Sequence, residues 1–280
     1  MLPPPVSSSL LSETTTVRPG STFTVAVVLV MEPGWHTYWM NPGGAGMAPR
    51  IQWTAPEGFS VSAIHWPQPH HLKTPGSGHY IYDDELVLLV DVTPPTQLPG
   101  LRTVSLMASV QWLACRDVCV RGESKDSLTL PVAGADTAES LQHPRLFKRA
   151  RERCPRAGHR LVPAALERWD GELVLIVRLP DESIVDPNKV YFFPEEEDIV
   201  DPGAAQFATG SPGRVEIRMQ PSDPLRPLPD FVRGVLVTGP AAGDSWNIAA
   251  RSVPKLPQGT EGGSSIPKNS SETRPVDSGA

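Results

Sequence analysis

The fold class of this chain is decided by the stretch Thr103-Val104-Ser105-Leu106-Met107-Ala108-Ser109-Val110-Gln111-Trp112. Every second residue, from Val104 to Trp112, is apolar, and the residues between them are mostly polar. This period of two is typical of a β-strand with one buried face. The stretch therefore predicts a sheet that packs one of its faces against a hydrophobic core.

Similar short runs are separated by turn residues along the whole chain, which holds 32 Pro and 23 Gly in 280 residues. Such frequent punctuation leaves little room for long helices and favours an all-β sandwich. Residues 22–31 begin with apolar alternation and then become continuously apolar, as expected of a strand that is buried on both sides. The predicted strands are 22–31, 50–54, 60–66, 85–92, 103–114 and 127–132, followed by 173–179, 189–193, 214–219, 231–238 and 246–251.

The two groups of strands are separated by a segment of different character. Apolar residues recur at roughly helical spacing between Leu141 and Ala150, Pro144 suits a first helical turn, and Pro155 stops the pattern. We therefore expect a flexible N-terminus at 1–13, a first β-sandwich at 14–133, a helical linker at 134–160, a second β-sandwich at 161–253 and a disordered tail at 254–280.

Charge and hydropathy exclude several classes of protein. The net charge of −6 argues against nucleic acid as a partner, and no apolar run approaches the ~20 residues of a membrane span. Neither a nucleophile elbow nor a glycine-rich phosphate loop is present in the sequence. The start at Met1–Pro5 leads us to expect a mature exported chain whose signal segment has been removed.

The chain contains three cysteines, and two of them, Cys115 and Cys119, are separated by only three residues directly after the decisive stretch. A tight hairpin would bring these two residues within disulfide range. Closing so short a loop stabilises a fold by roughly 2 kcal/mol at most. The spacing alone leaves two readings open, a redox-active pair or a structural disulfide.

Five separated motifs resemble the N-terminal region of the thiol:disulfide interchange proteins of the DsbD and ScsB type. The resemblance covers roughly residues 14–133, and its motifs occur in the expected order. They are Gly34-Trp35-His36-Thr37-Tyr38-Trp39-Met40-Asn41-Pro42-Gly43, Trp53–Phe59, Trp66-Pro67-Gln68-Pro69, Tyr80-Ile81-Tyr82, and Trp112-Leu113-Ala114-Cys115 with Val118-Cys119-Val120. Residues 190–194 and 234–236 resemble the following region of the ScsB-like branch more weakly.

The resemblance implies an immunoglobulin-like fold and a place in the bacterial periplasm. It implies a protein-disulfide reductase component whose catalytic residues are Cys115 and Cys119, with Cys119 forming the intermolecular bond and Cys115 resolving it. The partners would be a thioredoxin-like donor domain, a membrane electron-transfer domain on this chain or another, and oxidised periplasmic client proteins. No bound cofactor is needed, because the dithiol itself carries the electrons.

Residues 68–85 could shield the cysteine pair from unwanted oxidants. By resemblance to the capping loop of DsbD-type domains, we expect a loop in which Tyr80 or Tyr82 packs over the sulfur atoms. The same segment holds His70, His71 and His79, so a copper site that includes methionine is an alternative, although no pair has the spacing of a firm metal site.

A second reading of the whole chain stays open. It is a non-catalytic immunoglobulin-like interaction or copper-handling module, in which the Cys115–Cys119 disulfide is structural. Around the pair, Arg116 or Arg121 could lower a thiol pKa, whereas Asp117 would act in the opposite direction. Cys154 stands alone on a basic segment, and we expect no redox role for it.

Overall fold

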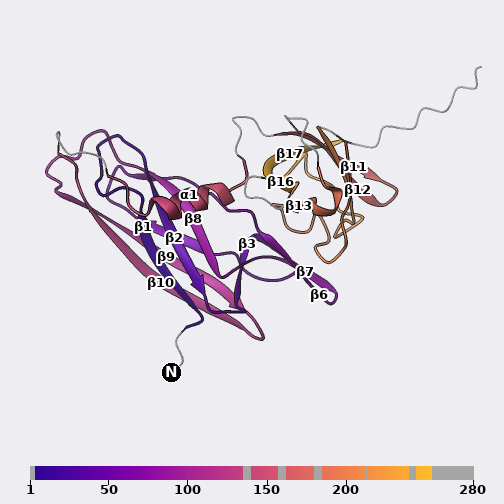
Figure 1. Cartoon of the computed structure of the whole chain (residues 1–280), viewed down its shortest axis with the longest axis horizontal. Coiled ribbons are helices and arrows are strands. Elements are labelled where there is room, and N and C mark those ends of the chain that lie inside the picture. Colours follow the sequence, from indigo (N-terminus) through magenta and orange to yellow (C-terminus); the bar gives the residue numbers. More distant parts are fainter. Residues whose placement is uncertain are drawn as a thin grey trace, which may run out of the picture.

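The computed structural model describes residues 4–134, 140–156, 162–179, 185–211, 213–239 and 244–253. Figure 1 shows two bodies of β-strands placed end to end, with helix α1 (Pro144–Arg153) alongside the first. The predicted disordered tail at 254–280 lies outside the described residues. No helix within the described ranges has the length and hydrophobicity needed to span a membrane.

The first body is a sandwich of two sheets. One sheet has the strand order β1 (Val6–Ser12), β2 (Phe23–Met31), β8 (Glu85–Thr93) and β5 (Ser60–Val61). The other has the order β10 (Cys119–Pro131), β9 (Thr103–Cys115), β3 (His36–Gly43), β7 (Ser77–Asp83) and β6 (His70–Thr74), and β4 (Arg50–Thr54) also pairs with β9.

The alternation that predicted a sheet with one buried face is confirmed in β9. Every second residue from Val104 to Trp112 is buried in the core between the two sheets, whereas Met107, on the other face, is 48% exposed. Because strand residues alternate between the faces of a sheet, the sequence pattern alone decides which side chains enter this core.

Strand β2 is apolar except for Thr24 because most of its length is covered on both faces. Val25, Val27 and Leu29 face the core of the sandwich, whereas Ala26 and Val28 pack against the helix. Helix α1 begins at Pro144, where a missing N–H costs nothing, and buries Phe147 and Ala150 against this sheet. Full burial of an aromatic side chain such as Phe147 contributes roughly 2 kcal/mol.

Two expectations about the first body are wrong. Residues 6–12 of the predicted flexible N-terminus form β1, which pairs in register with β2 from Val6 to Ser12 and buries Val6 and Leu10. The predicted loop at 68–85 is largely the hairpin of β6 and β7, because His70–Thr74 pair with Ser77–Ile81. In both cases polar and turn-forming residues obscure the sequence pattern of a strand, and pairing with neighbouring strands stabilises it.

The second body is one sheet of seven strands. Their order is β13 (Tyr191–Pro194), β16 (Phe231–Val237), β17 (Ser245–Val253), β11 (Val162–Trp169), β12 (Glu172–Arg178), β15 (Arg214–Met219) and β14 (Phe207–Ser211), with the 3₁₀ turn η1 (Pro187–Lys189) before β13. Phe192 in β13 and Ile217 in β15 belong to the same buried cluster. The sheet therefore curls until its two ends face each other across one core, which gives it the layered form of a sandwich.

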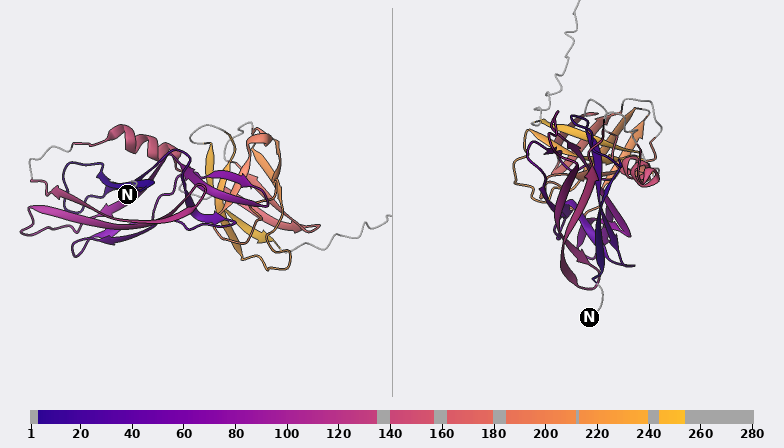
Figure 2. Two further views of the ribbon diagram at one scale, coloured as in Figure 1. Left: turned by 90° about the horizontal axis from the view of Figure 1, so that it is seen from below. Right: turned by 90° about the vertical axis from the view of Figure 1, so that its left-hand side faces the viewer.

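The two bodies share part of a core. Phe193, Val235 and Val237 of the second body pack into the buried cluster of the first. The β6–β7 hairpin reaches the second body (Figures 1 and 2). There, His71 stacks on Tyr191 with ring centroids 4.7 Å apart. The junction is therefore a packed interface and not only a linker.

Candidate functional site

Cys115 and Cys119 form a disulfide at the tip of the β9–β10 hairpin. The two strands pair without a break from Thr103 with Pro131 to Cys115 with Cys119, and the Cα atoms of the two cysteines are 4.1 Å apart. The three residues between them close the tip, where the Arg116 N–H donates to the Val118 carbonyl over 3.2 Å. This confirms the close approach of the pair that the sequence predicted.

The two cysteines differ sharply in exposure. Cys115, at the end of the central strand β9, is only 4% exposed, whereas Cys119, at the start of the edge strand β10, is exposed. Val118, next to Cys119, is 63% exposed. An attacking thiol can therefore approach this disulfide from the Cys119 side, and an apolar side chain lies beside that approach.

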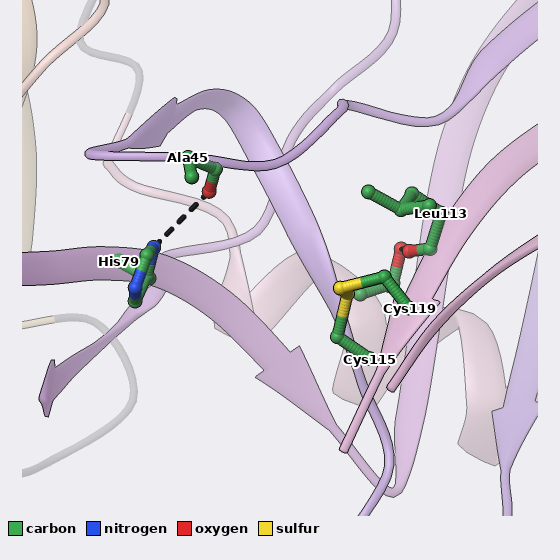
Figure 3. The surroundings of a disulfide bond; sticks show 6 residues. Ala45, His79, Leu113, Cys115 and Cys119 are labelled. Carbon is green, nitrogen blue, oxygen red and sulfur yellow. Dashed lines mark hydrogen bonds between the residues drawn. A yellow bond between two sulfur atoms is a disulfide. The ribbon is translucent and has the colours of Figure 1, made fainter. Parts of the chain in front are cut away.

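Cys115 is covered by side chains of the neighbouring strands. Tyr38 of β3 and Ile81 of β7 form a small buried cluster with it, and Leu72 and Leu113 pack against that cluster. Figure 3 shows the disulfide with Leu113 close by, together with a hydrogen bond between His79 and the Ala45 carbonyl over 3.1 Å. The cover is thus a largely apolar patch built on strands β3, β6, β7 and β9 of the same sheet.

Tyr80 and Tyr82 do not provide this cover. Both are buried on the opposite face of β7, in the core of the sandwich, and the Tyr82 hydroxyl donates to the Pro67 carbonyl over 2.7 Å. Because side chains of a strand alternate between faces, the residue between them, Ile81, is the one that reaches Cys115. The expectation that a tyrosine packs over the sulfur atoms is therefore wrong, although the segment is the right one. Reading residues 80–82 as a strand would have identified Ile81.

The charged residues at the tip largely compensate one another. Arg116 Nε lies 3.1 Å from Asp117 Oδ2, and its guanidinium carbon lies 5.2 Å from the centroid of the Trp35 ring. Arg121 is paired in register with Leu113, two residues from Cys115, and therefore lies on the same sheet face as the disulfide. Of the two arginines, Arg116 already has an acidic partner.

The histidines of the region do not converge on one point. His70 and His79 lie on the face of the sheet that carries the disulfide, whereas His71 lies on the opposite face, where its Nε2 is 2.8 Å from the Pro202 carbonyl. Among the described residues, no three His, Cys, Asp or Glu side chains are grouped so that they could hold a metal ion. Met40 lies in β3 and packs against the core of the sandwich.

Cys154 lies far from the pair, between α1 and the second body. Its Sγ is 3.8 Å from the His65 carbonyl, and it lines a cavity of about 410 Å³ together with Arg151 and Arg156. Burial raises the pKa of this thiol to about 11, against an opposing effect of Arg151. A thiol with so high a pKa is a poor nucleophile at neutral pH.

Comparison with known proteins finds a family similar to the first body. Residues 7–131 match the family model described as "Thiol:disulfide interchange protein DsbD, N-terminal". No curated protein sequence matches the chain at a significant level. The crystal structure of the N-terminal periplasmic domain of ScsB from Proteus mirabilis has a TM-score of 0.57 at 18% identity, and the match covers 88% of this chain and 91% of that one.

A second solved structure among the matches has a lower similarity. The full-length major pilin SpaD from Corynebacterium diphtheriae matches at 10% identity with a TM-score of 0.28, over 87% of this chain and 61% of that one. The ScsB structure therefore supports the all-β fold of both bodies, and the family match extends over the first body and includes the disulfide. Residues 7–131 are therefore similar to the N-terminal region of the DsbD thiol:disulfide interchange proteins.

Proposed function

We propose that Cys115 and Cys119 are a redox-active pair that relays reducing equivalents from a thioredoxin-like donor to oxidised proteins. The observation that carries this proposal is the unequal exposure of the two cysteines at a hairpin tip, in a domain similar to an interchange family. An exchange site needs one sulfur that a partner can reach and a second that stays protected until it resolves the intermediate.

The exchange runs in two steps. A donor thiolate attacks Sγ of Cys119, the Cys115–Cys119 bond breaks, and its electron pair leaves on Cys115 as a thiolate. A second donor thiolate then attacks the mixed disulfide, which releases the reduced pair and an oxidised donor. With an oxidised client the sequence is reversed, because the Cys119 thiolate attacks the client disulfide and Cys115 then attacks Cys119 to release the reduced client.

The surroundings of Cys119 suit a protein partner. Val118 and Val120 are 63% and 40% exposed, and they flank Cys119 in the sequence. Apolar side chains that stay exposed beside a reactive group are typical of a surface that a partner covers. We propose that a thioredoxin-like domain docks on this tip and buries both valines while the mixed disulfide exists.

The proposed compartment is the bacterial periplasm. The ScsB structure is of a periplasmic domain, and a relay of this kind needs a source of electrons across the inner membrane. We propose that a membrane electron-transfer domain, on this chain or another, reduces the thioredoxin-like donor. The second β-sandwich, expected at 161–253, would support the first body and contribute no chemistry of its own.

Trapping of the mixed disulfide tests the proposal. In a Cys154→Ser background, Cys115→Ala leaves Cys119 without its resolving partner, so it should accumulate a covalent complex with an oxidised thioredoxin-like domain. Cys119→Ala leaves only the buried Cys115 and should trap much less. Non-reducing electrophoresis followed by mass spectrometry of the linked peptides measures both outcomes. Equal trapping by both variants, or none by either, would contradict the proposed exchange.

A further inference from the structure

His36 lies directly opposite Cys115 in the sheet. Strands β3 and β9 are paired with His36 and Cys115 as partners, and the Thr37 hydroxyl donates to the Leu113 carbonyl over 3.1 Å. Directly opposed residues in antiparallel strands point to the same face, with their Cβ atoms roughly 5 Å apart. The His36 imidazole therefore lies next to the less exposed sulfur of the pair.

The ring is held in that place by its neighbours. The His36 and Tyr38 rings meet edge to face with centroids 5.4 Å apart, and Tyr38 itself packs against Cys115 and Ile81. The imidazole is therefore part of the cover of Cys115 while it remains half-buried. A cover made only for exclusion of water would use apolar side chains throughout, whereas this one includes a group that binds and releases a proton.

We propose, on the basis of the exchange proposed above, that His36 accepts the proton of the Cys115 thiol when Cys115 attacks and returns it when Cys115 leaves. Proton transfer over this separation takes place directly or through one water molecule. In the resolving step, the thiol proton passes to the His36 imidazole and the Cys115 thiolate attacks Sγ of Cys119. The Cys115–Cys119 bond forms, the bond between Cys119 and the client breaks, and the client sulfur leaves with the electron pair.

The charges around His36 suit a proton acceptor. Burial lowers the pKa of His36, His79 lowers it further, and Asp83 opposes them by raising it. The imidazole is therefore mainly neutral at pH 7 and free to take a proton. The titratable and charged residues of the surrounding elements on this side of the sheet are Tyr38, His70, His79, Asp83, Arg116, Asp117 and Arg121, and further along β9 from Cys115 they are Arg50, Glu123 and Lys125.

The two neighbours that could replace His36 are already engaged. Asp83 Oδ1 lies 3.4 Å from His70 Nδ1, and Asp83 is the register partner of His36 on β7. His79 lies further along β7, where its Nδ1 is 3.1 Å from the Ala45 carbonyl. His36 is therefore the histidine that lies directly opposite Cys115 in the pairing of β3 with β9.

The test uses 5,5′-dithiobis(2-nitrobenzoate) as the disulfide and the reduced full chain in a Cys154→Ser background. Cys119 attacks first and releases one coloured thiolate, and Cys115 then resolves the mixed disulfide and releases a second. Stopped-flow absorbance separates the two steps. With His36→Asn we expect an unchanged first release at pH 7 and a second release slowed about 100-fold. The midpoint of the pH profile of the second step should also rise, toward that of an unassisted thiol.

His65→Asn is the matched control, because His65 pairs with Asp91 at 3.0 Å on the other sheet. It should leave both releases and their pH profiles unchanged. An unaltered second release in His36→Asn, or equal slowing of both releases, would overturn the role of His36. Absence of the second release from the chain that keeps His36 would instead count against the proposed exchange itself.

A measurement without any substitution at position 36 tests the same role. NMR titration of the His36 ring should show one protonation step in the disulfide form. In the reduced form a second step should appear at the pH where the Cys115 thiol ionises, because the two groups share a proton. Identical titration curves in both forms would overturn the proposal, even if His36→Asn failed to fold.

Discussion

At the scale of single residues, the unequal exposure of the two cysteines follows from the strands that carry them. Cys115 ends the central strand β9 and is covered by side chains of β3 and β7, whereas Cys119 begins the edge strand β10. Edge strands keep one side open to a partner, and central strands do not. The position in the sheet therefore makes Cys119 the reachable sulfur before any difference in chemistry is considered.

The cover of Cys115 gives a testable prediction. Ile81→Ala removes a buried side chain from contact with Cys115, which should cost about 2 kcal/mol of folding free energy and open a path to the sulfur. Oxidation of the reduced pair by hydrogen peroxide should become faster. Tyr82→Phe is the control, since it removes only the hydrogen bond to the Pro67 carbonyl on the opposite face, at a cost of about 1 kcal/mol.

Thiol titration after timed exposure to peroxide measures both variants. If Tyr82→Phe accelerated oxidation as much as Ile81→Ala, the assignment of the cover to Ile81 would be wrong. Equal rates for Ile81→Ala and the unaltered chain would mean that Tyr38 and Leu113 are sufficient to exclude small oxidants.

At the scale of elements, the loop that follows β3 holds the cover in place. A side chain at Gly46 would overlap the ring of Tyr38, and the backbone there has a φ of 137° that L-residues rarely adopt. The loop backbone thus approaches the Tyr38 ring more closely than a residue with a Cβ atom would permit. The Tyr38 ring therefore lies between this loop and the other two members of its cluster, Ile81 and Cys115.

Gly46→Ala should therefore disturb the site, and Gly76→Ala separates that effect from backbone strain. Gly76 also has a positive φ, 76°, but nothing lies near its missing Cβ. We expect Gly76→Ala to cost about 1 kcal/mol through strain alone. Gly46→Ala should cost more and should also speed attack on the pair by iodoacetamide after reduction. Equal losses in urea unfolding, with equal alkylation rates, would contradict the packing of the loop on Tyr38.

The elements also show how far local sequence patterns reach. Strands β2 and β9 could be predicted from consecutive residues. Strand β9 alternates between apolar and mostly polar residues, and β2 is an almost continuous apolar run. Strand β3 and the β6–β7 hairpin could not, because glycines, histidines and tyrosines there resemble a loop. The cysteine pair was visible from spacing, whereas its cover depends on which face of β7 looks toward β9. That information is set by pairing between distant strands.

At the scale of the whole molecule, the second body packs against the sheet that carries the disulfide, on the face opposite to that bond. Tyr80 and Trp39, on the face of the sheet opposite to Cys115, meet the Phe193 ring with centroids 5.0 and 6.1 Å away. Asn41 donates from Nδ2 to the Pro194 and Glu196 carbonyls over 2.8 and 3.1 Å. The strands that cover the disulfide are therefore supported from behind by a different body of the chain.

Asn41→Ala tests the strength of this junction. The substitution leaves the buried Pro194 carbonyl and the partly buried Glu196 carbonyl without this donor, and the loss at Pro194 alone should cost about 1–3 kcal/mol. Urea unfolding followed by tryptophan fluorescence should show this loss. Asn188→Ala is the control, because Asn188 bonds only within its own turn to Asp186 and should change stability by less than about 0.5 kcal/mol. Equal stability of the two variants would mean that the junction contributes little.

The junction also predicts a dependence on pH. Burial lowers the pKa of His71 below its ordinary value of 6.5, with the Pro202 carbonyl opposing that shift. Below pH 6.5 the unfolded chain takes up a proton that the folded chain resists, so stability falls as the pH is lowered. His36 has a lowered pKa as well and acts in the same direction. His71→Gln should therefore lose less stability between pH 7 and pH 5 than the unaltered chain, as measured by urea unfolding at each pH. A loss of the same size in both would contradict the burial of neutral His71.

The sequence could not have predicted the junction. The sequence suggested a metal ligand at His71 and gave no sign that Asn41 would be buried. Residues 191–202 contact both side chains, so that Asn41 is buried and His71 half-buried. Contacts between segments more than 100 residues apart leave no periodic trace in either segment. The single curled sheet of the second body could not be predicted for the same reason, because it depends on the parallel pairing of β11 with β17, which are distant in the sequence.

The central claim is that the Cys115–Cys119 disulfide is an exchange site and not a structural bond, and its reduction potential tests this most directly. The full chain in a Cys154→Ser background would be equilibrated with graded dithiol and disulfide buffers, with thiols counted by mass spectrometry and β-structure followed by circular dichroism. We predict a potential above about −300 mV and an unchanged fold in the reduced form. A potential well below about −300 mV, or loss of β-structure on reduction, would show that the disulfide is structural and would contradict the relay.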